Sequence, residues 1–232
     1  MTPIILVPGL LCTAEMFTAQ TTALWPYGPV MVASTLGGKT MADIAGAILR
    51  DAPPSFALAG ISMGGYIAFE IMRQAPERVS RLALLDTSAR ADTPDQIAAR
   101  RASVAEARAG DFAEFVGKTI GAIVHPDRRD DPALRTVGIR MALSLGVEGF
   151  ARQTEAIIGR PDSRSGLASI RAPTLVLVGD RDALTPPERS QEIAAAVSGA
   201  TLVVVPECGH ASTIERPEAV NRALIDWISA AP

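Results

Sequence analysis

A serine with the surroundings of a catalytic nucleophile lies in a Gly-x-Ser-x-Gly run at residues 60–64. The run follows the apolar stretch Phe56–Ala59 and precedes a helical pattern at Tyr66–Gln74, so we expect a tight turn between a strand and a helix. Such a turn exposes the hydroxyl and is so crowded that the positions two before and two after the serine favour glycine. The sequence therefore predicts that Ser62 is a nucleophile. An ordinary glycine-rich loop is the competing interpretation.

A serine hydroxyl needs a base that accepts its proton, and the chain contains only two histidines. His210 comes shortly after the strand-like run Thr201–Val205 and just before the last helical pattern, which favours it as the base. His125 stands next to Pro126 between two helical patterns, and we expect it on a solvent-facing loop. We therefore predict His210 as the base.

The third member of such a group is a carboxylate that orients the imidazole, and it is expected between the serine and the histidine in sequence. Two expected strands end on candidates. Asp180 and Asp182 follow Thr174–Val178, and Asp86 follows Leu82–Leu85. Chain order alone leaves all three open.

These motifs resemble the α/β-hydrolase superfamily, and in particular its carboxylesterases with a serine nucleophile. In that family the acid follows a glycine and two variable residues, and a proline comes a few residues later. The segment from Gly179 to Pro186 has this form, with Asp182 at the acid position. The resemblance thus implies Asp182 as the acid, Asp180 as a residue that structures the loop, and Asp86 as a strand-end residue near the pocket or a hinge of the cap.

Acyl transfer also needs two backbone amides that stabilise the oxyanion. One belongs to Met63, the residue after the serine. The resemblance implies that the second belongs to Leu10, in the loop after the apolar run Ile4–Val7. Most relatives have His-Gly in this loop, whereas the chain has Pro8-Gly9. This departure keeps the amide and removes a side chain that often braces the loop.

Six apolar runs are expected as strands, and helical patterns separate most of them. The runs are Ile4–Val7, Val30–Ala33, Phe56–Ala59, Leu82–Leu85, Thr174–Val178 and Thr201–Val205. This arrangement predicts an α/β fold with a doubly wound, mainly parallel sheet, and the short segment before Ile4 predicts that the N-terminal strand hairpin of many relatives is missing. Three helix starts have a hydroxyl followed three residues later by a carboxylate or an amide: Thr40 with Asp43, Thr93 with Gln96, and Thr185 with Glu188.

Residues 87–173 separate two consecutive expected strands, which is far more chain than one crossover helix needs. Helical patterns fall at about 95–108, 112–121, 132–145 and 147–158. The resemblance makes this insertion a helical cap over the catalytic centre, so we predict a core domain of residues 1–88 and 170–232 and a cap of residues 89–169. Packing between cap and core is the competing role for the candidate pocket residues. These are Leu11, Phe112, Phe115, Met141, Leu145 and Phe150.

Composition limits the class of protein. With 48% hydrophobic and 20% charged residues among 232, the chain is expected to bury one core and to be neither disordered nor fibrous. A net charge of −3 and a pI near 5.5 provide no basic surface for nucleic acid. No apolar run reaches the length of a membrane span, and the first residues enter a strand without a leader, so we expect a cytoplasmic protein. The two cysteines, Cys12 and Cys208, fit a reducing compartment.

The residues together predict a serine hydrolase that cleaves small or medium, mostly apolar carboxylic esters through an acyl-enzyme on Ser62. Its partner is a small-molecule ester, and we expect no metal and no organic cofactor because side chains complete the chemistry. Lactonase, thioesterase, carbon–carbon hydrolase, acyltransferase and perhydrolase reactions use the same serine. The alternative is a ligand-sensing or interaction protein of the same fold with weak or no turnover. A resemblance of residues 33–40 to a phosphate-binding loop would leave Ser62, Asp182 and His210 unexplained.

Four cationic residues of the insertion could bind a carboxylate: Arg90, Arg100, Arg101 and Lys118. Helical arginines more often form a solvated face, which is the competing interpretation for each. The sequence does not indicate an oligomeric state.

Overall fold

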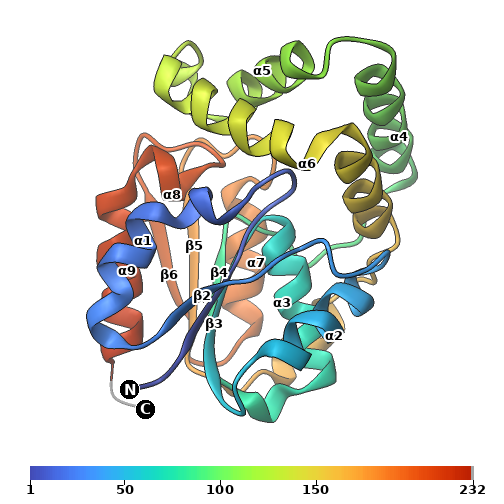
Figure 1. The fold of residues 1–232 in the computed structure, drawn as a ribbon. Helices are drawn as coiled ribbons and strands as arrows, with labels where there is room; N and C mark the ends of the chain where they lie inside the picture. Colours follow the sequence, from blue (N-terminus) through green and yellow to red (C-terminus); the bar gives the residue numbers. More distant parts are fainter. Residues whose placement is uncertain (231–232) are drawn as a thin grey trace.

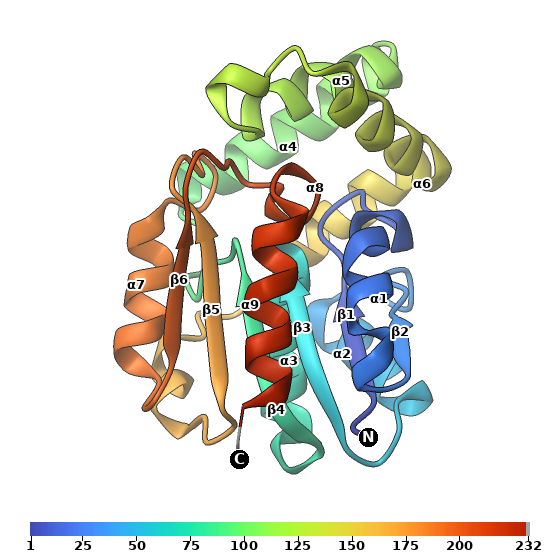
Figure 2. The same cartoon turned by 90° about the vertical axis from the view of Figure 1, so that its left-hand side faces the viewer.

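The computed structural model describes residues 1–230, and its core is one six-stranded sheet (Figures 1 and 2). All five strand pairs are parallel, and the strands lie in the order β2-β1-β3-β4-β5-β6. The strands are β1 Ile4–Val7, β2 Val30–Val32, β3 Phe56–Ile61, β4 Val79–Leu85, β5 Thr174–Gly179 and β6 Thr201–Val205. The predicted α/β fold with a doubly wound parallel sheet is confirmed, and in residues 1–230 the sheet contains only parallel pairs.

Helices cover both faces of the sheet, so the central strands are buried on both sides (Figures 1 and 2). Every residue of β1, β3 and β5 is buried, whereas the edge strands β2 and β6 are partly exposed. On one face lie α1 Thr18–Leu24, α8 Ser212–Glu215 and α9 Pro217–Ser229, and on the other lie α2 Met41–Asp51, α3 Met63–Gln74 and α7 Pro187–Ala196. Short 3-10 helices occupy Ala14–Phe17, Trp25–Tyr27, Pro76–Arg78, Pro126–Arg128 and Arg164–Ser169.

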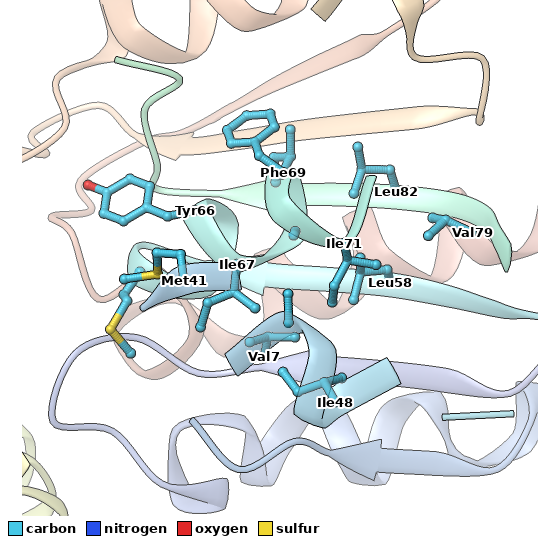
Figure 3. Packing of buried hydrophobic residues seen from close by; sticks show 14 of the residues in the cluster. Val7, Met41, Ile48, Leu58, Tyr66, Ile67, Phe69, Ile71, Val79 and Leu82 are labelled. Carbon is cyan, nitrogen blue, oxygen red and sulfur yellow. The ribbon is translucent and has the colours of Figure 1, made fainter. Parts of the chain in front are cut away.

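Alternate strand residues pack into different layers, because successive side chains point to opposite faces of a sheet. Val7, Leu58 and Leu82 join the core formed with α2, α3 and α7 (Figure 3). In that core they meet Ile67 and Ile71 of α3. The strands thus supply apolar residues to both layers, which explains why they are continuous apolar runs in the sequence.

Three helices between β4 and β5 lie beyond the carboxyl ends of the strands (Figures 1 and 2). They are α4 Pro94–Ala109, α5 Phe112–Ile123 and α6 Pro132–Ile158. α6 is interrupted at Gly146, where φ is 69° and ψ is 171°, a conformation that glycine adopts without steric cost. The two helical segments predicted on either side of this residue are therefore distinct. The division of the chain into a core and a cap at residues 88 and 170 stays a prediction.

Two of the three predicted helix starts are confirmed as reciprocal capping boxes, at residues 40–43 and 93–96. The third prediction is wrong. α7 begins at Pro187 without a side-chain cap, and the Thr185 hydroxyl donates to the carboxylate of Asp182. Among residues 1–230, no helix is both long enough and apolar enough to cross a bilayer.

Candidate active site

Ser62 is the one residue between β3 and α3, and its backbone is strained. Its φ of 54° and ψ of −116° lie in a region that residues other than glycine rarely adopt. A Cβ on Gly60 would lie 2.3 Å from the carbonyl oxygen of Gly64, and a Cβ on Gly64 would lie 2.0 Å from that of Val7. Both positions therefore need glycine, and the predicted tight turn from strand to helix is present.

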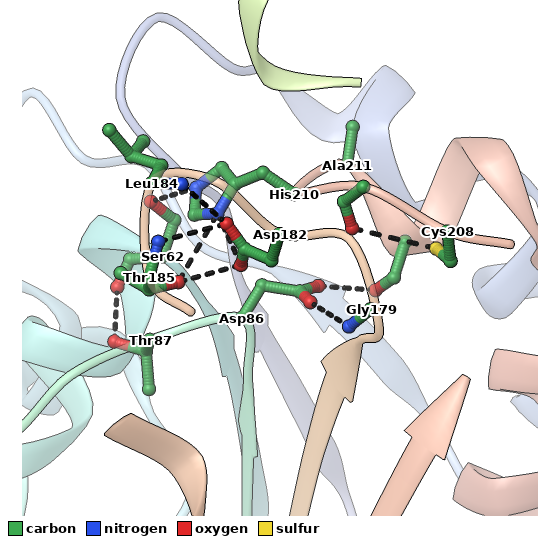
Figure 4. A network of polar contacts seen from close by, with 12 residues as sticks. Ser62, Asp86, Thr87, Gly179, Asp182, Leu184, Thr185, Cys208, His210 and Ala211 are labelled. Atoms are coloured by element: carbon green, nitrogen blue, oxygen red, sulfur yellow. Dashed lines mark hydrogen bonds and ion pairs between the residues drawn. The ribbon is translucent and has the colours of Figure 1, made fainter. Parts of the chain in front are cut away.

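The side chain of Ser62 begins a series of hydrogen bonds that continues to His210 and Asp182 (Figure 4). His210 Nε2 lies 2.8 Å from Ser62 Oγ, and His210 Nδ1 lies 2.8 Å from Asp182 Oδ2. With the proton on Nδ1, the ring donates to the carboxylate, and Nε2 accepts the hydrogen bond of the serine. The structure thus brings the three predicted residues together at distances that suit general-base activation.

Backbone and hydroxyl donors surround the carboxylate of Asp182 (Figure 4). Its Oδ1 accepts from the amides of Leu184 and Thr185 at 2.8 Å each, and its Oδ2 accepts from the Thr185 hydroxyl at 2.7 Å. Burial favours the neutral acid, but the charge and hydrogen bond of His210 and these donors outweigh it and lower the pKa of Asp182. Burial also disfavours the imidazolium, yet the Asp182 carboxylate outweighs it and raises the pKa of His210. The pair therefore stabilises a charged carboxylate beside a histidine that can accept a proton.

The other two candidate carboxylates connect loops. Asp86 Oδ1 accepts from the amide of Gly179 at 3.0 Å, and its Oδ2 accepts from the hydroxyl of Ser212. Burial, reinforced by a neighbouring negative charge, raises the pKa of Asp86 to about 8. Asp180 Oδ1 accepts from the amide of Cys208 at 3.0 Å, so it joins the loop after β5 to the loop after β6. Within the described residues, neither side chain forms a hydrogen bond with the histidine ring.

Two backbone amides next to Ser62 are available for an oxyanion. The loop after β1 lies against the serine, since a Cβ on Gly9 would be 3.4 Å from the Cβ of Ser62. Leu10 follows in this loop, and Met63 opens α3, where the first amides lack acceptors within the helix. In residues 1–230 neither amide donates to another backbone or side-chain acceptor. The role of these amides stays a prediction.

Gln153 of α6 braces the loop after β1, a role that was not predicted from the sequence. Its Oε1 accepts from the amide of Leu11 at 2.9 Å, and its Nε2 donates to the Thr35 hydroxyl at 2.9 Å. Leu11 has a positive φ of 58°, so this bond holds a residue in a conformation that leucine disfavours. The one sign of this role in the sequence is a polar glutamine in a helical segment whose apolar residues pack on the core. A brace is thus present although Pro8 replaces the usual histidine.

A cavity of about 720 Å³ is lined by residues of the inserted helices and of the loops that follow the strands, and Ser62 and His210 are among them. Four of the predicted pocket residues also line it: Leu11, Phe115, Met141 and Phe150. The other two, Phe112 and Leu145, lie outside the lining. The Phe112 ring packs against those of Phe115 and Phe150 at centroid distances of 6.3 Å, so it supports the wall, and Leu145 is a half-buried residue beside the helix interruption.

Within residues 1–230, His125 and the two cysteines form no side-chain hydrogen bond with Ser62, His210 or Asp182. His125 is not solvent-facing: its side chain is only 12% exposed, and its amide donates to Glu215 Oε2 at 2.8 Å. Burial raises the pKa of the Cys12 thiol to about 12 and that of the Cys208 thiol even further. Such thiols stay protonated at neutral pH, which makes them poor nucleophiles. Among residues 1–230, no cluster of three or more histidine, cysteine or acidic side chains could hold a metal ion.

The parallel sheet, the strained serine turn and the bonded serine, histidine and aspartate are together typical of hydrolases. The sequence profile of the alpha/beta hydrolase family matches residues 4–223, and the chain belongs to this family. It is similar to the structure of a thermophilic esterase from Thermogutta terrifontis, with 30% identity and a TM-score of 0.87 over 98% of this chain and 89% of that one. It is also similar to the structure of an enol-lactonase from Burkholderia xenovorans LB400, with 25% identity and a TM-score of 0.89 over 99% and 92% of the two chains.

A curated relative is also an esterase. The pimeloyl-acyl-carrier-protein methyl ester esterase of Aromatoleum aromaticum is 29% identical over 78% of this chain and 77% of its own length. With the family match, these similarities identify the chain as a hydrolase of the alpha/beta hydrolase fold.

Proposed function

We propose that this hydrolase cleaves carboxylic esters with Ser62 as the nucleophile, His210 as the base and Asp182 as the acid that orients the base. The observation that carries the proposal is the unbroken series of hydrogen bonds from Ser62 Oγ through His210 to Asp182, next to a cavity large enough for a small molecule. The names of the relatives support ester chemistry, and a lactone is a cyclic ester that follows the same steps.

In the acylation half of the reaction, Ser62 Oγ attacks the ester carbonyl carbon while His210 Nε2 takes its proton. The carbonyl oxygen becomes an oxyanion, and the amides of Leu10 and Met63 donate to it. When the carbon–oxygen bond to the alcohol breaks, the leaving oxygen takes the proton from His210. The Asp182 carboxylate stabilises the transient imidazolium and keeps the ring in place.

Deacylation repeats these steps with water as the nucleophile. Water gives a proton to His210 Nε2 as its oxygen attacks the acyl carbonyl, and the same two amides hold the second oxyanion. Cleavage of the bond to Ser62 releases the carboxylic acid, and the histidine returns its proton to the serine oxygen. All protons are thus carried by residues of this chain and by the substrates.

The inserted helices are proposed to form a cap that shapes the pocket for the substrate. Apolar side chains from two of these helices, Phe115, Met141 and Phe150, join Leu10 and Leu11 in the cavity lining. Such a wall favours an aliphatic acyl or alcohol group of small or medium size, because apolar surface is buried when the group enters.

The first test combines nitrophenyl esters of short and medium acyl chains with a fluorophosphonate probe, read by intact mass and peptide mapping. We expect turnover and one adduct, on Ser62, and loss of both in Ser62→Ala. Ser103→Ala is the matched control, since Ser103 also lines the cavity but forms no hydrogen bond with a histidine. A folded sample without turnover and without an adduct would refute the proposal, and the interpretation as a ligand-sensing protein would take its place.

A further inference from the structure

The cavity wall carries an excess of positive charge. Five basic residues line it, Arg90, Arg100, Arg160, Arg189 and Lys118, against only two acidic residues, Asp92 and Glu106. The whole chain has a net charge of −3, so this excess is a local property of the cavity and does not follow from the composition. A low-dielectric cavity wall with charges of one sign attracts ligands of the opposite sign.

Two of the five cations are neutralised by partners that do not line the cavity. Arg90 forms two hydrogen bonds with the Glu192 carboxylate, at 2.9 and 2.8 Å. Lys118 lies 2.8 Å from the carboxylate of Glu114 on the same helix. Both pairs have their charge balanced within the protein, and so the excess belongs to the remaining three arginines.

Arg100 and Arg160 share the single carboxylate of Asp92. Arg100 Nε lies 2.6 Å from Asp92 Oδ2, Arg160 Nη2 lies 2.8 Å from Oδ1, and the Asp92 side chain is only 1% exposed. One negative charge between two guanidinium groups leaves a net positive charge in this cluster. An uncompensated charge beside a cavity indicates an anionic ligand, because a charge held away from bulk water is stabilised by an opposite one.

Of the two guanidinium groups, only that of Arg100 has its outer nitrogens available. Arg160 donates to the carbonyl oxygens of Arg90 and Ile157 as well as to Asp92, and it lies over the Tyr66 ring at 4.2 Å. Arg100 bonds through Nε alone, and within residues 1–230 its Nη1 and Nη2 groups have no acceptor. The outer edge of a guanidinium can donate two parallel hydrogen bonds to one carboxylate.

Asp92 also makes the arginine a better receptor, since it fixes the guanidinium before any ligand arrives. A preorganised side chain loses less conformational entropy on binding than a free one. Arg189 of α7 lines the same cavity, and in the described part of the chain it has no ion pair, so it is a second cation available to an anion.

We propose that the substrate is an ester or lactone that carries a free carboxylate, with Arg100 binding the carboxylate bidentately and Arg189 as a second cation. The proposal rests on the proposed ester hydrolysis and specifies its substrate class. The apolar lining then contacts the carbon chain between the carboxylate and the scissile carbonyl at Ser62. Specificity for this class comes from the arginine, because an ester without the charge would leave the guanidinium edge in the cavity without an acceptor from the ligand.

The competing explanation is structural. Arg100, Asp92 and Arg160 connect α4, the loop after β4 and the end of α6, so the cluster could serve only to tie the inserted helices to the sheet. In that case a substitution of Arg100 would affect all substrates equally. The ratio of activities toward charged and neutral esters therefore separates the two explanations.

The experiment compares the monomethyl and dimethyl esters of linear dicarboxylic acids of graded length, by kcat/KM, in the protein of 232 residues. We expect the wild type to prefer a monomethyl ester, whose carboxylate is ionised at neutral pH. Arg100→Met should reduce the ratio of monoester to diester kcat/KM by about 10- to 100-fold, the size of a hydrogen bond to a charged group. Arg101→Met is the matched control: this next residue is 62% exposed, pairs with Glu155 and does not line the cavity. It should keep the wild-type ratio.

Arg189→Met provides a second variant in case Arg100→Met does not fold, because Arg189 has no ion pair to lose. This variant should also reduce the ratio of monoester to diester kcat/KM, by a smaller factor than Arg100→Met. An unchanged ratio in both folded variants, or a wild type that prefers the diester, would overturn the proposal.

A third measurement separates the anion-site proposal from the hydrolase proposal, namely the melting temperature of Ser62→Ala with and without the monoester. If the wild type has no esterase activity, but the monoester stabilises Ser62→Ala and Arg100→Met abolishes this stabilisation, the anion site stands and the hydrolysis is refuted. Hydrolysis of the diester without any preference for charge would refute the anion site alone.

Discussion

Replacement of Gln153 by leucine tests whether the inserted helices position the proposed oxyanion amide. Gln153 is 2% exposed and makes two hydrogen bonds of 2.9 Å, one from the Leu11 amide and one to Thr35. Leucine is similar in size and removes both bonds. A buried polar group without a partner costs about 1–3 kcal/mol, so we expect the free energy of unfolding to fall by about 2–6 kcal/mol for the Leu11 amide and the Thr35 hydroxyl together.

The same substitution should reduce turnover. Loss of one oxyanion donor typically costs about 10²–10³ in kcat, and that is the upper limit here, because the amide of Leu10 would be displaced and not removed. We expect kcat for a nitrophenyl ester to fall about tenfold while KM changes little, since the bond strengthens a contact made in the transition state.

Denaturant unfolding and steady-state kinetics measure the two effects separately. Gln191→Leu on α7 is the matched control, because Gln191 is exposed and lines no cavity, and it should leave kcat unchanged. If Gln153→Leu loses stability but keeps the wild-type kcat, the brace is structural only. Wild-type stability and wild-type kcat together would refute the argument from the hydrogen bonds.

Two further predictions concern the proposed acid and base. Asp182→Asn should lower kcat by about 10³–10⁴, whereas Asp86→Asn should keep most of the wild-type kcat. The raised pKa of Asp86 leaves its carboxyl group protonated at neutrality, and the amide of asparagine is a close replacement for it. The reverse ranking of the two variants in steady-state kinetics would transfer the acid role to Asp86. A plot of kcat/KM against pH should rise through a midpoint above 6.5, the ordinary pKa of histidine, because the pKa of His210 is raised and its protonated ring cannot act as a base. A profile without such a rise near neutrality would argue against His210 as the base.

The strands could be predicted because a parallel sheet buries both faces and therefore needs continuous apolar runs. All six strands were identified, and the differences between the predicted and the observed strand bounds have physical reasons. β4 begins at Val79 and not at Leu82, since Ser80 and Arg81 are polar and lie at the more exposed start of the strand. β3 continues to Ile61, into the motif predicted to form the turn.

The serine turn could also be predicted, because its demands are local: a strand, a glycine at each crowded position and a helix. Contacts between residues distant in sequence could not be predicted. Gln153 reaches Leu11 across 142 positions in the sequence, and no local pattern indicates that contact. Thr185 was assigned to a helix cap because a hydroxyl before a proline and a carboxylate is typical of one. In the fold its hydroxyl donates to Asp182, since a buried charge needs donors and a helix start open to water does not.

The choice between Asp182 and Asp86 illustrates why residue type and order were insufficient. Both follow a strand, both are buried, and both lie near His210. Asp182 receives three hydrogen bonds from the backbone and hydroxyl of its own loop and one from the histidine, and these hold its pKa down. Asp86 receives two, and burial beside a charged neighbour raises its pKa to about 8.

Two carboxyl groups so close together cannot both remain charged without a cost, so the one with more donors takes the charge and the other takes a proton. A charged acid can stabilise the imidazolium of His210, whereas a protonated one can only hold loops in place. The hydrogen-bond donors around each carboxyl group therefore decide which aspartate can support the proposed catalysis. Those of Asp182 come mainly from its own loop, whereas those of Asp86 come from segments distant in sequence.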